Sequence, residues 1–197
     1  MEPILINIPS VIETERLLLR HPQADDGRIV NEAIHESFAM LEPWMPWART
    51  LPSVEESEAF VRRKHAQWIL REELMLLIFD RTQKSLIGCT GFHSINWCVP
   101  RFEIGYWIRS SCQGCGFIKE STATLTQFAF GALSARRIEI RCDTRNVRSA
   151  NVPQRLGYRL EAVLQNDSLD ASGQQLRDAM VFARVDAEDL PNVKASW

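Results

Sequence analysis

The alternation of hydrophobic and polar residues changes its period near the middle of the chain. From residue 102 to 109 it has a period of two, which predicts a β-strand. One face would carry Phe102, Ile104, Tyr106 and Ile108, and the other Glu103, Gly105, Trp107 and Arg109. After Phe117 the period becomes helical, with apolar residues at Leu125, Phe128, Ala129, Ala132 and Leu133. We therefore expect a strand, a turn with two glycines, and a helix whose free N–H groups could hold a phosphate.

The rest of the chain follows the same two periods. Six further strands are predicted over residues 14–20, 74–79, 86–92, 137–142, 158–164 and 177–184. Helices are predicted over residues 24–40, after a capping box at Ser53 and Glu56, and over residues 149–156. We expect a hairpin turn at residues 80–84, a left-handed stop at Gly157, and a frayed tail at residues 186–197. The expected fold class is α+β, with a mixed central sheet of about seven strands and helices on both faces.

Length and composition favour a single domain over residues 1–197. The formal net charge of −2 gives no overall argument for binding nucleic acid directly. The N-terminus carries Glu2, Glu13 and Glu15 and no basic leader ahead of its apolar run, so we expect no signal peptide. No uncharged run approaches the roughly 20 residues of a membrane span. Five cysteines, an odd number without a disulfide pattern, indicate reduced thiols in a cytoplasmic protein.

Several ligand classes fit the glycine turn poorly. A Walker loop requires Gly-Lys-Ser/Thr, which is absent, and a dinucleotide fingerprint requires a third glycine where Lys119 stands. Cys112 and Cys115 form a lone C-x-x-C without a second pair of ligands, so no metal site is expected. The glycine turn alone is a weak signal. A second pattern, N-x-x-S-x-x-V-x-x-R-x-G-Y, which starts at Asn146, makes it more specific.

Together, the turn Q-G-x-G and this second pattern resemble the GNAT superfamily of acetyl-CoA-dependent N-acetyltransferases. The chain is most similar to the RimJ/RimL branch, the N-terminal acetyltransferases of ribosomal proteins. Motifs in matching order extend the resemblance: TERLLLR at 14–20, WMPW at 44–47, LIGCTGF at 86–92, EIGYW at 103–107 and FAF at 128–130. The resemblance covers about residues 13–184 and implies the GNAT acyl-CoA N-acyltransferase fold.

The resemblance also implies a role for individual residues. Backbone groups of Trp107, Ile108 and Arg109 would pair with the pantetheine arm of acetyl-CoA in a split between two parallel strands. Main-chain N–H groups of Gln113, Gly114, Cys115, Gly116 and Phe117 would hold the pyrophosphate. Asn146 would contact the pantetheine. Ser149 matches the residue that protonates the departing thiolate, and Glu103 matches a carboxylate that takes a proton from the amine, directly or through water.

Two positions depart from the family pattern. Ser111 stands where the family has Gln or Arg. Pro153 lies in the predicted helix, where it lacks a donor N–H and crowds the carbonyl of Ser149, four residues earlier.

Other interpretations of these side chains remain open. Glu103 could be a solvated or paired strand residue, and Ser149 could be a helix cap. Trp44 and Trp47 could fill the core or form one wall of a pocket. Seven arginines between residues 136 and 159 would mostly be solvated, with one or two near the ribose phosphate of coenzyme A or an acidic partner.

The expected activity is transfer of an acetyl group to a primary amine, most readily a protein N-terminal α-amine. An amine attacks only in its neutral form, and at pH 7 this costs about 1 to 1.5 kcal/mol for an α-amine but about 4.5 for lysine. The alternatives are a small acceptor such as a polyamine or an antibiotic, and an acyl-CoA-binding protein without turnover. The pattern does not distinguish a monomer from a homodimer.

Overall fold

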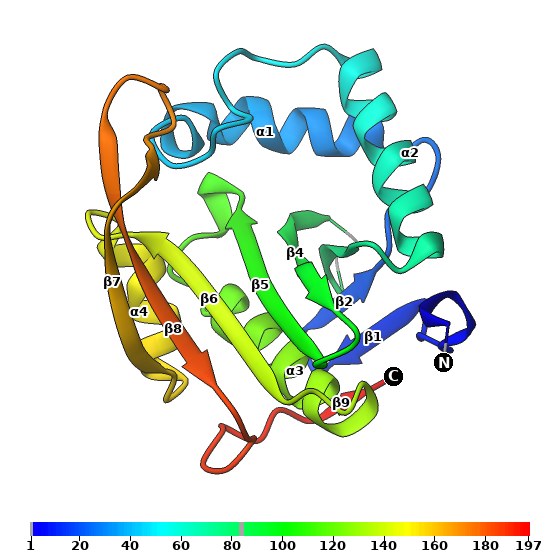
Figure 1. Cartoon of the computed structure of the whole chain (residues 1–197). Helices are drawn as coiled ribbons and strands as arrows, with labels where there is room; N and C mark the ends of the chain where they lie inside the picture. Colours follow the sequence, from blue (N-terminus) through cyan, green and yellow to red (C-terminus); the bar gives the residue numbers. More distant parts are fainter. Residues whose placement is uncertain (1, 83–84) are drawn as a thin grey trace.

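The structure is a computed structural model that describes residues 2–82 and 85–197. Nine strands of the described part form one sheet in the order β7-β8-β6-β5-β4-β3-β2-β1-β9 (Figure 1). The strands are β1 (Val11–Thr14), β2 (Leu17–Arg20), β3 (Leu74–Asp80), β4 (Leu86–Asn96), β5 (Arg101–Ile108), β6 (Arg137–Asp143), β7 (Arg159–Leu169), β8 (Leu176–Arg184) and β9 (Ala195–Ser196). The helices are α1 (Gly27–Leu41), α2 (Val54–Leu70), α3 (Phe117–Ala132) and α4 (Val147–Arg155), with 3-10 turns at Pro3–Leu5 and Ser110–Cys112.

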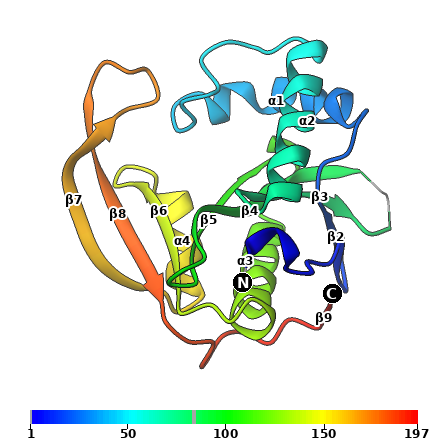
Figure 2. The same ribbon diagram turned by 45° about the vertical axis from the view of Figure 1, so that its right-hand side comes forward.

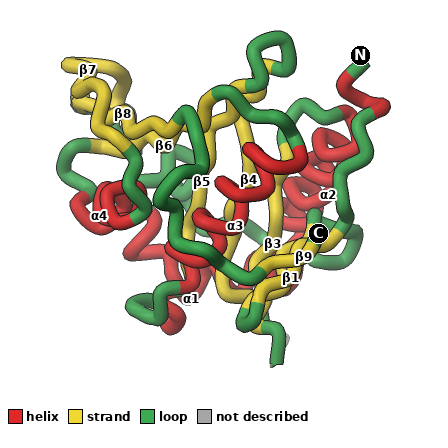
Figure 3. Tube along the Cα trace, turned by 90° about the horizontal axis from the view of Figure 1, so that it is seen from below, coloured by secondary structure: helices red, strands yellow, loops and turns green. Residues whose placement is uncertain are grey.

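Helices cover both faces of the sheet, as the sequence predicts. The fully buried strand β3 shows this best, because its successive side chains point to opposite faces. Leu74, Leu76 and Ile78 join a core cluster with residues of α3 and α4, whereas Met75, Leu77 and Phe79 join a cluster with α1 and α2. Figure 3 shows α3 lying across one face of the strands.

The predicted first strand over residues 14–20 is wrong at its start: Thr14 ends a separate strand, β1, and β2 begins at Leu17. Strands β1 and β2 pair antiparallel, with Val11 opposite Arg20. Thr14 makes the turn, since its hydroxyl oxygen accepts hydrogen bonds from the N–H groups of Arg16 (3.3 Å) and Leu17 (2.9 Å). A threonine side chain that satisfies nearby backbone donors competes with a continuing strand.

The C-terminal tail is also ordered beyond the prediction. Residues Ala195–Ser196 form β9, which pairs with β1, and the ring of Trp197 packs edge-on against Phe128 at a centroid distance of 5.4 Å. The split first strand and β9 account for nine strands in place of about seven. Ala132 is exposed and not on the buried face of α3. In the predicted turn at 80–84, residues 83–84 lie outside the described part, and the N–H of Asp80 donates to the carbonyl of Ser85 at 2.9 Å.

The feature that shapes the site is the pairing of β5 with β6. It is the one parallel pair among the described strands, and its register ends at Glu103 opposite Glu139, although β5 continues to Ile108. On its other side β5 pairs with β4 throughout, and the N–H of Arg109 donates to the carbonyl of Ile87 at 2.8 Å. Since backbone groups alternate sides along a strand, those of Tyr106 and Ile108 face the gap beside β6.

The β7–β8 hairpin closes the other side of this region. Figure 2 shows it as a long curved ribbon whose tip approaches the chain that follows α1. There the side chain of Arg49 donates a hydrogen bond to the carbonyl of Ala171 at 3.0 Å. A Cβ on Gly173 would lie 2.8 Å from the same guanidinium, so the glycine permits this close approach.

Candidate active site

The glycine turn between β5 and α3 has the geometry of an anion cradle. Gly114 and Gly116 both have positive φ, 77° and 79°, and Gly116 is the N-cap of α3. No side chain caps this helix end, so its first N–H groups remain free for a ligand. A helix N-terminus with free donors attracts phosphate through both hydrogen bonds and the helix dipole. The predicted turn is therefore present, and its residues fit the pyrophosphate of coenzyme A.

Side chains from α1 hold the start of the turn. Glu36 accepts hydrogen bonds from the N–H of Ser111 and the hydroxyl of Ser110, each at 3.0 Å, and forms an ion pair with Arg109. Burial alone would raise the pKa of Glu36, but the hydrogen bonds from Ser111, Arg109 and Ser110 outweigh it and lower the pKa from 4.5 to about 2. Arg109 is therefore held by α1, and its backbone N–H bonds to β4. Because backbone groups alternate sides along a strand, those of Trp107 also face β4, opposite Cys89. Of the three predicted backbone contacts with pantetheine, only that of Ile108 faces the gap beside β6.

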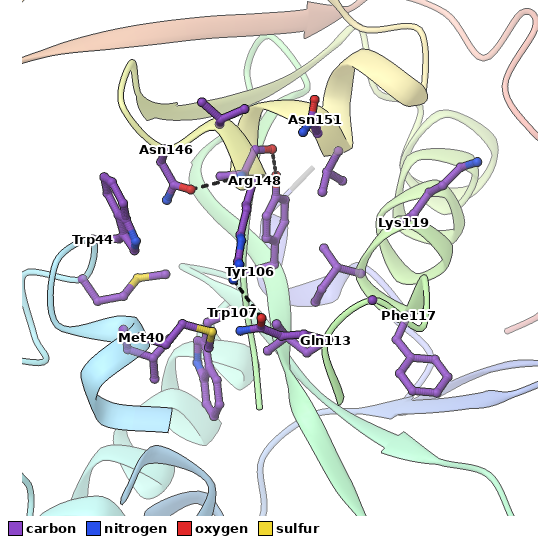
Figure 4. A pocket seen from close by; sticks show the side chains of 18 of the residues that line it. Met40, Trp44, Tyr106, Trp107, Gln113, Phe117, Lys119, Asn146, Arg148 and Asn151 are labelled. Atoms are coloured by element: carbon purple, nitrogen blue, oxygen red, sulfur yellow. Dashed lines mark hydrogen bonds between the residues drawn. The ribbon is translucent and has the colours of Figure 1, made fainter. Parts of the chain in front are cut away.

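Beside the turn lies a cavity of about 930 Å³, called here the larger cavity. It is bordered by the gap next to β5, the turn, and the N-terminal half of α4. Its basic lining residues are Lys119, Arg145, Arg148 and Arg155. Figure 4 shows Arg148 reaching toward Gln113, whose side-chain oxygen accepts a hydrogen bond from it at 2.9 Å. Three of the seven clustered arginines therefore line the cavity beside the glycine turn.

The first turn of α4 brings the next candidate residues together. The side chain of Asn146 caps the helix by accepting the N–H of Ser149 at 3.1 Å, so Ser149 is not the cap. The Ser149 hydroxyl donates to the hydroxyl of Tyr106 at 3.3 Å, and Tyr106 donates to the carbonyl of Ser149 at 3.0 Å. Burial raises the pKa of Tyr106 well above its usual range, so its phenol is neutral.

A second cavity, of about 610 Å³, lies on the α1–α2 side of the same strands and is called here the smaller cavity. Glu103 lines it with a side chain that is 17% exposed, and His93 Nε2 lies 3.9 Å from its Oε1. The space beside Gly105 is occupied, because a Cβ there would meet His93 Nε2 at 2.8 Å. The imidazole fills that space and is a site residue that the sequence did not reveal.

The two cavities meet at the point where β5 and β6 separate. The residues that line both are Trp44, Met45, Tyr106, Trp107, Asn146 and Ser149. Trp44 lines both cavities and Trp47 the smaller one, which favours the pocket-wall interpretation for both rings. Burial raises the pKa of the nearby Cys142 thiol to about 11, so this wall is also uncharged at neutral pH. Such a passage can hold a long ligand on one side and its reaction partner on the other.

Most predicted site residues gather on the larger cavity. These are Trp107, Ile108, Gln113, Gly114, Gly116, Phe117, Asn146 and Ser149. Glu103 lies apart on the smaller cavity, while Arg109 is held by α1 and Cys115 is exposed. The sequence missed Tyr106 and His93: Tyr106 lies on the apolar face of its predicted strand, and nothing in the spacing links His93 to the site.

Comparison with known proteins places this arrangement in a family. The model of the acetyltransferase (GNAT) domain matches residues 16–159. The chain belongs to the GNAT acetyltransferase family. It is 28% identical to the ribosomal-protein-serine acetyltransferase of Escherichia coli over 161 residues, which cover 77% of this chain and 85% of that one. It is 29% identical to the N-acetyltransferase YoaA of Bacillus subtilis over 156 residues, covering 79% and 86%.

The structural comparison agrees with the GNAT fold. RimL, the ribosomal L7/L12 alpha-N-protein acetyltransferase, in complex with coenzyme A, superimposes with a TM-score of 0.82 at 24% identity, covering 92% of this chain and 99% of that one. The expected family, its RimJ/RimL-like branch and the GNAT fold are confirmed, and the chain is an acetyl-CoA-dependent N-acetyltransferase. No helix within residues 2–82 and 85–197 is long and apolar enough to cross a membrane.

Proposed function

We propose that this GNAT enzyme transfers the acetyl group of acetyl-CoA to the α-amine of a protein N-terminus. The observation that carries the proposal is the meeting of two cavities at the β5–β6 split, with Glu103 on the smaller one and the anion cradle on the larger. Acetyl-CoA fits the larger cavity, which leaves the smaller one for the amine. The similarity to a ribosomal-protein-serine acetyltransferase supports a protein acceptor.

The nature of the site favours an α-amine over lysine. Neutralising an α-amine at pH 7 costs about 1 to 1.5 kcal/mol, against about 4.5 kcal/mol for a lysine side chain. The other carboxylates that line the smaller cavity already have partners: Glu73 pairs with Lys64, Asp143 pairs with Arg145, and Glu56 accepts the N–H of Ser53. Glu103, with its neighbour His93, is therefore the group we assign to accept a proton. One weakly paired carboxylate is sufficient for an amine that is already partly neutral.

In the reaction, Glu103 accepts one proton from the amine, directly or through water. The amine nitrogen then bonds to the acetyl carbon, the carbon–sulfur bond breaks, and the second N–H proton ends on the sulfur. The free N–H groups of Tyr106 and Ile108 beside the split are placed to stabilise the oxyanion that develops on the acetyl oxygen. Ser149 supplies a hydrogen bond to the departing sulfur.

Residues that line the larger cavity bind the cofactor. The N–H groups from Gly114 to Phe117 hold the pyrophosphate, and Lys119, Arg148 and Arg155 surround the phosphates with positive charge. The C-x-x-C thiols have no part in this scheme.

A matched acceptor panel tests the proposal. We would compare a lysine-free peptide with a free N-terminus, the same peptide with a blocked N-terminus and one lysine, a polyamine and an aminoglycoside. Acetylation would be followed by thiol release and mass spectrometry. The expected result is the highest kcat/KM for the free α-amine. A polyamine or aminoglycoside that is acetylated tenfold more efficiently than any peptide would replace the protein acceptor with a small molecule.

A further inference from the structure

Tyr106 and Ser149 form a closed pair of hydrogen bonds at the junction of the two cavities. The tyrosine hydroxyl donates to the Ser149 carbonyl at 3.0 Å and accepts from the Ser149 hydroxyl at 3.3 Å. Figure 4 shows the Tyr106 ring pointing from β5 toward α4. Both residues line both cavities, so the pair faces the site of acetyl transfer.

Pro153 explains why the Ser149 carbonyl is available. In a regular α-helix this carbonyl accepts the N–H of the residue four positions later, and proline has none. The helix nevertheless continues through Pro153 to Arg155. A buried carbonyl without a donor is costly, and the Tyr106 hydroxyl fills the vacated position.

The tyrosine is suited to orienting a hydrogen bond without giving up its own proton. Its ring is largely buried, and burial raises its pKa, so it does not ionise at neutral pH. The titratable groups that act on it are Cys142 of β6 and Tyr158. Burial raises the pKa of both, so each is neutral under assay conditions. Its hydroxyl can turn from the Ser149 carbonyl to the Ser149 Oγ, because both oxygens lie within reach.

We propose that Tyr106 is a positioning residue for Ser149, and that Pro153 creates the acceptor that holds it there. When negative charge develops on sulfur, the Tyr106 hydroxyl turns to the Ser149 Oγ and the Ser149 proton points to the sulfur. No proton leaves the tyrosine in this exchange. The inference rests on the proposed role of Ser149 as hydrogen-bond donor to the sulfur. It adds the residue that orients the Ser149 hydroxyl.

A double-mutant cycle tests the coupling. Tyr106→Phe keeps the ring and removes the hydroxyl, and it should lower kcat about tenfold with the KM for acetyl-CoA within about twofold. In a Ser149→Ala background the same change should have almost no further effect. If Tyr106→Phe lowers kcat by the same factor in the wild-type and the Ser149→Ala backgrounds, the proposal is overturned.

The second tyrosine of the chain provides the matched control. Tyr158 is buried, and its hydroxyl is hydrogen-bonded to that of Thr126 at 2.6 Å. Tyr158→Phe should lower the Tm and leave kcat unchanged. If it lowers kcat as much as Tyr106→Phe, the effect of both is structural and the positioning role is wrong.

Pro153→Ala separates activity from stability. The new N–H competes with Tyr106 for the Ser149 carbonyl, so kcat should fall about two- to threefold. The Tm should rise, because alanine suits a helix interior better than proline does. A purely structural role would move both quantities in the same direction, and an unchanged kcat would remove Pro153 from the proposal.

A measurement that needs no acceptor distinguishes this inference from the proposed function. The thiol of bound coenzyme A would be titrated by its thiolate absorbance, with desulfo-coenzyme A as the blank so that protein cysteines cancel. Wild type should lower the thiol pKa relative to both Tyr106→Phe and Ser149→Ala. Equal thiol pKa values in all three proteins would overturn the positioning role even if amines are acetylated. A lowered value in a protein that acetylates no amine would support it while the proposed function fails.

Discussion

The guanidinium of Arg16 donates a hydrogen bond from Nη1 to the carbonyl oxygen of Cys115, 3.0 Å away, across 99 residues of sequence. Arg16 lies in the β1–β2 turn, and its other nitrogens bond to Glu120 in the first turn of α3. In a trans peptide the carbonyl and the following N–H point in opposite directions. Because the Cys115 carbonyl points toward Arg16, the N–H of Gly116 points away from Arg16, to the side of the larger cavity.

We expect Arg16→Gln to weaken coenzyme A binding without changing the chemistry. Loss of a hydrogen bond from a charged group is worth about 1.5 kcal/mol, so the Kd should rise about tenfold while kcat at saturating acetyl-CoA stays within about twofold. Calorimetry would measure the Kd for coenzyme A, and steady-state kinetics would measure kcat. Arg28→Gln is the control, because Arg28 makes only an exposed pair with Glu32 within its own helix. An equal loss of affinity in both variants would contradict the role of Arg16.

A second prediction separates charge from backbone shape in the cradle. Gly114 has a φ of 77°, and a Cβ there would have no atom within 4 Å, so a side chain fits. Asparagine tolerates this left-handed conformation better than most residues. Gly114→Asn should therefore bind coenzyme A within a few-fold of wild type, whereas Gly114→Asp, of the same shape, should bind much more weakly. Unchanged affinity in the aspartate variant would show that the pyrophosphate lies elsewhere.

The strand, turn and helix around this cradle were predictable because each has a local cause. Alternation defines β5, glycines allow the positive φ values, and a helical repeat defines α3. The division between β1 and β2 was not predictable, since a hydrogen bond that the Thr14 hydroxyl oxygen accepts from the N–H of Leu17 decides the turn. Strand β9 depends on a distant partner, β1, and has no periodicity of its own.

For the site, the sequence indicated which residues lie near the cofactor but not how they contact one another. Tyr106 alternates with polar residues as any core residue of a strand would, and only the fold places its hydroxyl against Ser149. The same holds for His93, which occupies the space beside Gly105 from the neighbouring strand. Pro153 was recognised as unusual from the sequence, and its consequence, a carbonyl free to accept Tyr106, required the structure.

A third prediction concerns stability at low pH. The pKa of Glu36 is lowered in the folded protein from 4.5 to about 2, so its contribution to stability is present above about pH 4.5 and is lost as the pH falls toward 2. Glu36→Gln should have a lower Tm than wild type at pH 7, and the difference should shrink across that window. Thermal melts of both proteins from pH 7 to pH 2 would measure it. A Tm difference that stays constant with pH would show that the carboxylate charge is not involved.

The last prediction tests Glu103 as the base. Glu103→Gln keeps the shape and the hydrogen-bonding reach of the side chain and removes the proton acceptor. The variant then depends on amine that is already neutral in solution. Its rate should therefore rise about tenfold per pH unit and approach wild type only near the amine's own pKa, about 8 for an α-amine.

His93→Gln is the matched control for this profile, because His93 Nε2 lies 3.9 Å from Glu103 Oε1 in the same cavity. If Glu103 is the base, the histidine variant should keep the wild-type dependence on pH with at most a uniform loss of rate. A steep profile in the histidine variant and a wild-type profile in Glu103→Gln would assign the proton transfer to His93 instead. The pH–rate curve decides between the two because a neighbour that only shapes the cavity changes the rate equally at every pH, whereas the group that takes the proton changes its slope.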